Sequence, residues 1–330
     1  QYAQAEAVLA EAAQLAHTAG LRRFEASSLT MLGQIALNRG QYSEAERIYS
    51  QSLQVVGESY APGLWGKYVG RGLARLRSGD LNGARADFDL GLQSAAQVGS
   101  GYGQLLVQAY LTITCLAQGE PCGAPLRLEE IEKQARAAQI HAVAFLSGSV
   151  RGHTWRLLGE SARAEAAHQA ALQAAQAAQV PNFILQARVE WLADRLLLAP
   201  DDELRAQLQE TLEGARAAGE NTTVSLALLT DAADLLRQGK AQAALAAAQE
   251  GLALAQACPD LPLLAEACLL EAEIRAAQGE KEAARQALAQ ARQAAQKGHA
   301  ALLPALEGVE ARLEGRAPRP TPDQRNMLVG

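Results

Sequence analysis

The sequence predicts an all-α protein built as a solenoid of antiparallel helix pairs. Three observations lead to this prediction: strong helix formers fill most segments, no continuous β-branched run occurs, and one turn recurs along the whole chain. Aromatic residues make up only 4% of the 330 residues. A helical repeat that cannot bury its apolar face alone stacks on its neighbours, so the repeat predicts an extended superhelix with a groove.

The recurring turn first appears at Gly40, in the stretch LGQIALNRGQYSEAERIYSQSL at 32–53. Ala199 occupies the matching place in LLAPDDEL, where Pro and Asp act as helix breakers instead of glycine. A small residue follows five positions after most of these turns, which lets two helix backbones approach closely. The other copies of the turn are Gly79, Gly119, Gly159, Gly239 and Gly279.

A second set of helix breaks falls midway between these turns, so each unit is expected to be two helices of roughly 18 residues. Seven such units are predicted from about 21 to 298, with half a unit at 1–19 and a capping helix at about 300–314. Residues 1–314 form the predicted solenoid, and the proline-rich residues 315–330 form a predicted flexible tail or linker. The midway breaks are Gly20, Gly57, Gly99, Gln139, Val180 with Pro181, Gly219, Pro259 and Gly298.

The first unit resembles the tetratricopeptide repeat, with Gly33, Gly40, Tyr42, Ala45 and Tyr49 at its small, turn, aromatic, alanine and aromatic positions. The period is 40 residues, which is longer than the usual 34. In this longer period the chain resembles the sensor domains of bacterial transcription regulators of the maltose-regulator and LuxR types. The resemblance implies a right-handed superhelix. HEAT-type helix pairs are the second alternative, although they do not predict the G-x4-A turn. The second unit matches at Gly72, Gly79, Leu81, Ala84 and Phe88.

Several kinds of chemistry are not indicated by the sequence. No P-loop and no HExxH motif occurs, and the five histidines never pair at i, i+4, so no catalytic residue, cofactor or metal ligand is predicted. His168 lies where the first two units have an aromatic residue, and it is expected to be a hydrogen-bonded core histidine. Four cysteines without a CxxC pair favour a reducing, cytoplasmic location.

Two columns of residues on the first helices, eight and four positions before each turn, carry arginine and tryptophan. These side chains offer bidentate donors and flat stacking surfaces. In the tetratricopeptide family the first helix of each pair lines the concave groove, so the resemblance implies that these columns face or border a binding site. The alternative is that the long side chains fill space between repeats. The candidate binding residues are Lys67, Arg71, Arg75, Arg151, Trp155, Trp191, Arg195, Asp231 and Glu271.

The first functional hypothesis is a non-catalytic module that senses a ligand or partner for a larger bacterial regulator. Its ligand is expected to be an anionic small molecule or the anionic end of a peptide. The alternatives are a free-standing adaptor that binds a protein or peptide in its groove, and self-association through truncated end repeats; an enzyme is a distant fourth. Direct nucleic-acid binding is not expected because basic residues are sparse, and no apolar run is long enough to span a membrane.

Overall fold

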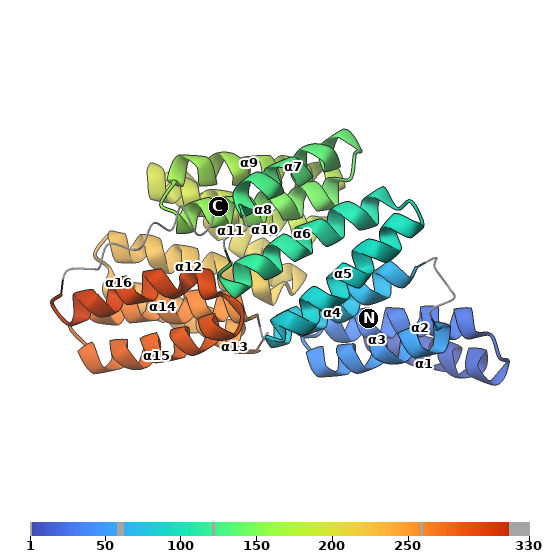
Figure 1. Cartoon of the computed structure of the whole chain (residues 1–330). Helices are drawn as coiled ribbons and strands as arrows, with labels where there is room; N and C mark the ends of the chain where they lie inside the picture. Colours follow the sequence, from blue (N-terminus) through green and yellow to red (C-terminus); the bar gives the residue numbers. More distant parts are fainter. Residues whose placement is uncertain (1, 58–62, 121–122, 258–259, 317–330) are drawn as a thin grey trace. The chain divides into compact units, whose positions relative to one another are not determined.

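The computed structural model describes residues 2–57, 63–120, 123–257 and 260–316. Across these ranges the chain is helical apart from short turns, with no β-strand (Figure 1). The elements are α1 (Tyr2–Thr18), α2 (Arg22–Asn38), α3 (Tyr42–Val56), α4 (Leu64–Ser78), α5 (Leu81–Gln97), α6 (Gly101–Gln118), α7 (Ala124–Ala137), α8 (His141–Leu157), α9 (Ser161–Ala178), α10 (Pro181–Leu198), α11 (Asp202–Ala218), α12 (Asn221–Arg237), α13 (Ala241–Ala257), α14 (Leu261–Ala277), α15 (Lys281–Gly298), the 3-10 helix η1 (Ala300–Leu302) and α16 (Leu303–Leu313).

The helix order confirms the predicted solenoid of helix pairs. In the described ranges, seven pairs run in chain order from α2 with α3 to α14 with α15, and α1 precedes them while α16 follows. The chain divides into two compact units, which we call unit 1 (residues 1–114) and unit 2 (residues 115–330) and describe separately. The predicted boundary between solenoid and tail stays a prediction, because residues 317–330 lie outside the described residues.

Most of the predicted glycine turns are left-handed helix ends, whereas Ala199 has φ −151°. Gly79 has φ 91° and its N–H bonds to the carbonyls of Arg75 and Leu76, which closes α4 in the way that glycine typically ends a helix. Gln139 and Gln179 adopt the same left-handed conformation, with φ 57° and 54°, although neither is glycine. Short turns therefore separate the helices at the predicted breaks that the structure describes, while the break predicted at Pro259 lies outside the described residues.

Glycines let the two helices of a pair approach closely. Tyr49 of α3 is buried against Gly33 of α2 and Gly70 of α4, where an added Cβ would lie 2.9 Å and 2.2 Å from its ring. In the same way, Gly72 faces Phe88. Gly152 faces His168, which is a large buried side chain on the second helix of its own pair. The spacing of small and large residues in the sequence thus corresponds to contacts between a first and a second helix.

Unit 2 contains a contact between helices that are far apart in the repeat order. Leu157 at the end of α8 packs against an apolar cluster to which α12, α13, α14, α15 and α16 all contribute, and which includes Leu263 and Leu306. The turn after α6 also reaches η1, since a Cβ at Gly119 would lie 3.1 Å from that of Ala300. The helix pairs of unit 2 therefore bring residues near 119 and 153 close to residues near 266 and 300.

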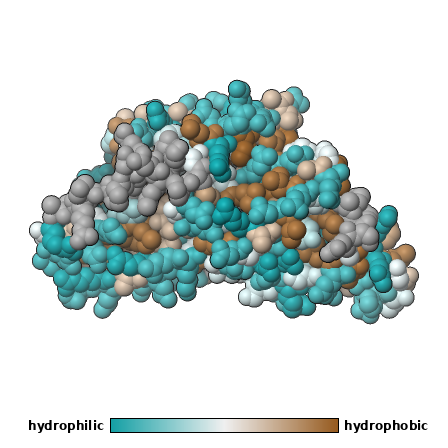
Figure 2. All heavy atoms as spheres, in the orientation of Figure 1, coloured by the Kyte–Doolittle hydropathy of each residue, from teal (hydrophilic) through white to brown (hydrophobic). Residues whose placement is uncertain are grey.

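The surface is mainly hydrophilic along the outer helices, and Figure 2 shows this clearly along the exposed face of α15. Among the described residues, the search for a helix long and apolar enough to cross a membrane found none.

Candidate functional site

The two predicted arginines of α4 are already paired inside unit 1. Arg71 donates from Nε and Nη2 to the two carboxylate oxygens of Asp87 on α5, at 2.9 Å and 2.6 Å. Arg75 donates to the same carboxylate at 3.0 Å and to Glu46 of α3 at 2.8 Å. Burial alone would lower the pKa of Arg75, but the effect of these carboxylates is larger, so the pKa of Arg75 is raised. Because Asp87 is only 1% exposed, both guanidinium groups are held against the second helices.

Lys67 differs from these arginines because it is buried without a partner. Its residue is only 6% exposed, and it makes no hydrogen bond or ion pair with any residue in the described ranges. Burial lowers the pKa of its ammonium group. Gly70 and Ala74 lie on the same side of α4 and pack near Tyr49, so this side faces the preceding helix pair. The Lys67 ammonium is thus partly desolvated and unpaired among the described residues, and an anionic group beside it would relieve part of that desolvation cost.

A pocket of about 280 Å³ lies between α3 and α4, beside Arg71. The Nη1 atom of Arg71 lies 3.4 Å from Ser50 Oγ, and its guanidinium carbon lies 5.8 Å from the centre of the Tyr68 ring. Arginine, hydroxyl and aromatic ring thus share one small opening in unit 1. The lining residues are Ser50, Leu53, Gln54, Gly57, Leu64, Tyr68 and Arg71.

The predicted arginine and tryptophan residues at 151, 191 and 195 are also directed to second helices, here in unit 2. Arg151 donates to Glu132 of α7 at 2.7 Å. Trp191 donates from Nε1 to Glu165 of α9 at 3.1 Å, and Arg195 lies 4.0 Å from the same carboxylate. The two columns therefore face the layer of second helices, and a binding role for their residues stays a prediction.

The remaining predicted residues have different surroundings. Trp155 is buried with the Arg163 guanidinium 4.8 Å from its ring centre, and it packs near α9. Glu271 accepts two hydrogen bonds from Arg275 of its own helix, at 2.9 Å and 2.8 Å. Asp231 is partly buried, and burial together with the nearby charge of Asp234 raises its pKa. A binding role for Trp155, Asp231 and Glu271 stays a prediction.

His168 is a core histidine, as predicted. Its Nδ1 contacts the carboxylate of Asp194, and its Nε2 lies 3.1 Å from the carbonyl oxygen of Ser149. Arg156 donates to the other oxygen of Asp194 at 2.8 Å. Burial alone would raise the pKa of Asp194, but His168 and Arg156 outweigh it and lower the pKa.

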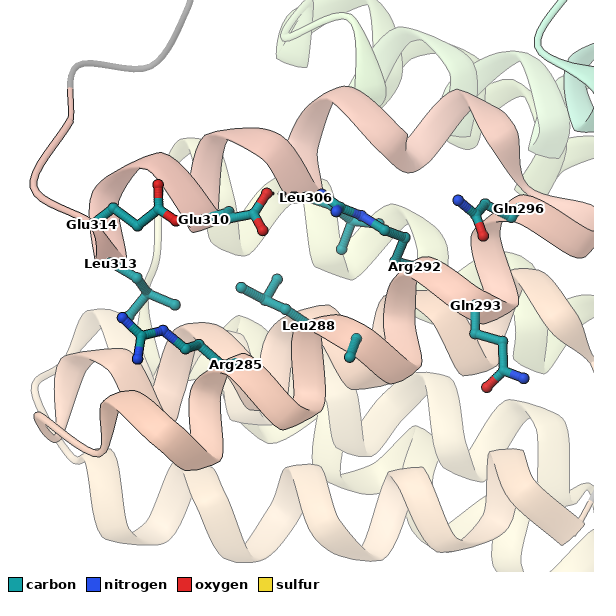
Figure 3. A pocket seen from close by; sticks show the side chains of 10 residues that line it. Arg285, Leu288, Arg292, Gln293, Gln296, Leu306, Glu310, Leu313 and Glu314 are labelled. Carbon is teal, nitrogen blue, oxygen red and sulfur yellow. Dashed lines mark hydrogen bonds and ion pairs between the residues drawn. The ribbon is translucent and has the colours of Figure 1, made fainter.

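A second cleft, of about 370 Å³, lies between α15 and the capping helix α16. Figure 3 shows its apolar side chains pointing between the two helices, with arginine and glutamate along the edges. Arg292 of α15 reaches Glu310 of α16 at 2.8 Å. The sequence analysis predicted this helix only as a cap. The apolar residues of the cleft are Leu288, Ala289, Leu306 and Leu313.

Neither a protein-family model nor a curated protein matches the sequence, whereas solved structures match its fold. The apo form of the quorum sensor NprR from B. thuringiensis aligns with a TM-score of 0.61 and 13% identity, over 88% of this chain and 82% of that chain. A Rap protein complexed with Competence and Sporulation Factor aligns with a TM-score of 0.56 and 12% identity, over 87% of this chain and 81% of that chain. The fold is that of tetratricopeptide-like helical-repeat proteins.

The tetratricopeptide-like fold brings together three residues that sequence analysis missed: His153, Glu266 and His299. His153 lies six positions before its turn glycine and Glu266 lies thirteen positions before its own, so they lie outside the two columns considered from sequence. The sequence signal is weak: both are polar residues at positions where other first helices carry an apolar residue, such as Leu73 and Leu106. The approach of α8 to α14 that unites them has no local sequence signature.

Proposed function

We propose that this chain is a non-catalytic binding module, the ligand- or partner-sensing part of a larger bacterial regulator. The observation that carries the proposal is the fold, a stack of helix pairs that aligns over most of its length with NprR and a Rap protein. NprR is described as a quorum sensor, and the Rap structure contains Competence and Sporulation Factor. A repeat scaffold keeps its architecture while its surface residues change, so the site must be argued from this chain's own side chains.

The charges of unit 1 support an anionic ligand. Arg71 and Arg75 are neutralised by acids of the chain, but Lys67 is buried without a partner. A partly desolvated cation without a partner is unfavourable for stability, and a bound carboxylate or phosphate would supply the missing charge and hydrogen-bond acceptors. The α3–α4 pocket beside Arg71 provides a small opening on the same helix. The proposed ligand is therefore an anionic small molecule or the anionic end of a peptide.

The experiment tests this site with defined probes. Inorganic phosphate, citrate, adenosine monophosphate and short acidic peptides with free C-terminal carboxylates are screened by thermal shift, and binding is then measured by calorimetry. Lys67→Met and Arg71→Gln are expected to weaken the binding of a hit at least tenfold, because each removes a positive charge from α4. Arg47→Gln is the matched control, since Arg47 is exposed and pairs only with Glu44 in the same turn of α3.

Two outcomes would overturn parts of the proposal. If no probe stabilises the wild-type chain, an anionic ligand is rejected. If a probe binds but Lys67→Met leaves its affinity unchanged, the site on α4 is rejected. The double variant Arg151→Ala with Trp191→Ala then tests the second predicted cluster, and unchanged binding there would reject that cluster as well.

The free-standing adaptor is the second candidate, and the α15–α16 cleft favours it. The cleft is lined by apolar side chains, and the paired Arg292 and Glu310 lie beside them. Such a surface suits an amphipathic partner helix that has an apolar face bordered by charged residues. Arg292→Ala should weaken binding of such a helix without affecting the anionic probes. A partner that binds equally well to this variant would not use the cleft.

A further inference from the structure

We propose that His153, Glu266 and His299 form a binding site for a divalent transition-metal ion of the Zn²⁺ class. The site would lie in unit 2 and join α8, α14 and the turn after α15. This inference is independent of the proposed ligand site in unit 1. It also differs from the sequence analysis, which predicted no metal ligand because no two histidines have metal-ligand spacing.

The distances among the three side chains fit one metal ion. Glu266 Oε1 lies 3.0 Å from His153 Nε2 and 3.4 Å from His299 Nε2, and all three ligand atoms lie within 4.8 Å of one another. Ligands placed about 2.0–2.1 Å from a tetrahedral Zn²⁺ ion are about 3.3 Å apart, which is the edge of the tetrahedron. The two separations that involve Glu266 are therefore close to those that a tetrahedral ion requires.

His299 supplies a second, independent observation. Its side chain is only 10% exposed, and its Nε2 atom is buried without a hydrogen-bond partner. The contact of this nitrogen with Glu266 at 3.4 Å lacks hydrogen-bond geometry. A buried imidazole nitrogen without a partner is costly, and coordination to a metal ion would satisfy its lone pair.

The turn after α15 fixes the position of His299. The backbone N–H of His299 bonds to the carbonyl of Ala295 at 2.8 Å, and Leu302 bonds back to the His299 carbonyl at 2.9 Å. Gly298 lies so close to α14 that an added Cβ would be 2.9 Å from Leu261. This close approach places the His299 ring near Glu266, one helical turn further along α14.

The ligand chemistry favours Zn²⁺ over Mg²⁺ or Ca²⁺. Two imidazole nitrogens and one carboxylate are typical zinc ligands, whereas Mg²⁺ and Ca²⁺ prefer oxygen alone. A bound cation would replace the protons of the two imidazoles as the positive partner of the Glu266 carboxylate. The side chains of His153 and Glu266 are 31% and 28% exposed, which leaves room for water as a further ligand.

A second carboxylate contributes negative charge nearby. Burial opposes the charged form of His153, but Glu266 and, to a smaller extent, Glu190 of α10 favour it, and together they raise the pKa of His153. Glu190 Oε1 accepts hydrogen bonds from Ser149 and Gln186, at 2.9 Å and 2.8 Å, while its Oε2 is buried without a partner. A cation bound at His153 would be attracted by Glu190 as well as by Glu266.

The proposal is tested on the full chain, free of any affinity tag and treated with a chelator. Zn²⁺ binding is measured by calorimetry, and Co²⁺ is added separately to record the visible absorption of a tetrahedral site. We expect one tight site per chain and a rise in melting temperature with Zn²⁺. His299→Gln and Glu266→Gln should each weaken Zn²⁺ binding at least tenfold. His17→Gln is the matched control, because the His17 side chain is 68% exposed and lies in unit 1.

Three results would overturn the proposal. The first is that the wild-type chain does not bind Zn²⁺, and the second is that His299→Gln binds Zn²⁺ as tightly as wild type. The third is a Co²⁺ spectrum with the intense near-ultraviolet bands of thiolate ligands, because it would place the metal on cysteines. Circular dichroism confirms that each variant is folded. His153→Gln keeps the test decisive if Glu266→Gln fails to fold, since undiminished binding by this variant would also reject the site.

Discussion

Replacing Gly70 by alanine tests whether the Tyr49 ring sets the distance between α3 and α4. A Cβ at Gly70 would lie 2.2 Å from Tyr49 Cζ, whereas ordinary contacts are 3.4–4 Å. Overpacking a core costs about 1–3 kcal/mol, and the clash here is severe enough to expect the upper end of that range. Alanine regains about 1 kcal/mol over glycine within a helix. The net expectation is a loss of about 2 kcal/mol in the free energy of unfolding.

Gly66 provides the control for this prediction, because it lies one turn earlier in α4 and an added Cβ would meet nothing within 4 Å. Gly66→Ala should therefore stabilise the chain by up to about 1 kcal/mol, so the two variants should differ by about 3 kcal/mol. The assay is urea unfolding followed by far-ultraviolet circular dichroism. Equal stability of the two variants would refute the argument, because it would mean that the Tyr49 ring can move aside freely.

Three further predictions concern single side chains of unit 2. Asp194→Asn should lower the free energy of unfolding by about 1.5–3 kcal/mol at neutral pH. Because folding lowers the pKa of Asp194, its contribution is present above about pH 4 and is lost as the pH falls further. Urea titrations should therefore show that the difference in stability between wild type and variant disappears in acid. Asp201→Ala should lower the free energy of unfolding in urea by about 1 kcal/mol, because the Asp201 side chain caps α11. It accepts a hydrogen bond from the Leu204 N–H at 2.7 Å. A variant as stable as wild type would contradict this. Cys268 should resist iodoacetamide at pH 8 until the chain unfolds, because burial raises its thiol pKa to about 11; peptide mass mapping that found it alkylated in the folded chain would disprove this.

The fold was predictable because its determinants are local. Gly40 and Gly79 open left-handed turns at the places where the periodic pattern breaks, and Gln139 does the same without being glycine. Tyr49 and Phe88 occupy the large positions that face glycines of the first helix. Such spacing rules act within one helix pair, so they are visible in a window of about 40 residues.

The pairing of Arg71 was also encoded locally, but it requires a different rule. Arg71 lies eight residues before Gly79 and Asp87 lies eight residues after it, and positions equidistant from a turn face each other in an antiparallel helix pair. This rule would have shown that Arg71 points to α5. It does not apply to His153 and Glu266, which meet because distant helix pairs of unit 2 approach each other.

The contact between α8 and α14 changes how unit 2 should unfold. In an open stack of repeats, each pair contacts only its neighbours, so the terminal pairs can detach one at a time. The His153–Glu266 ion pair joins the first complete pair of unit 2 to its last, and Leu157 of the first pair packs on the apolar cluster that α12 to α16 form. Detaching the last pair then breaks contacts at two places in the order of repeats. Hydrogen exchange in α14 and α8 should consequently occur in one cooperative event, which an open stack of the same length would not show.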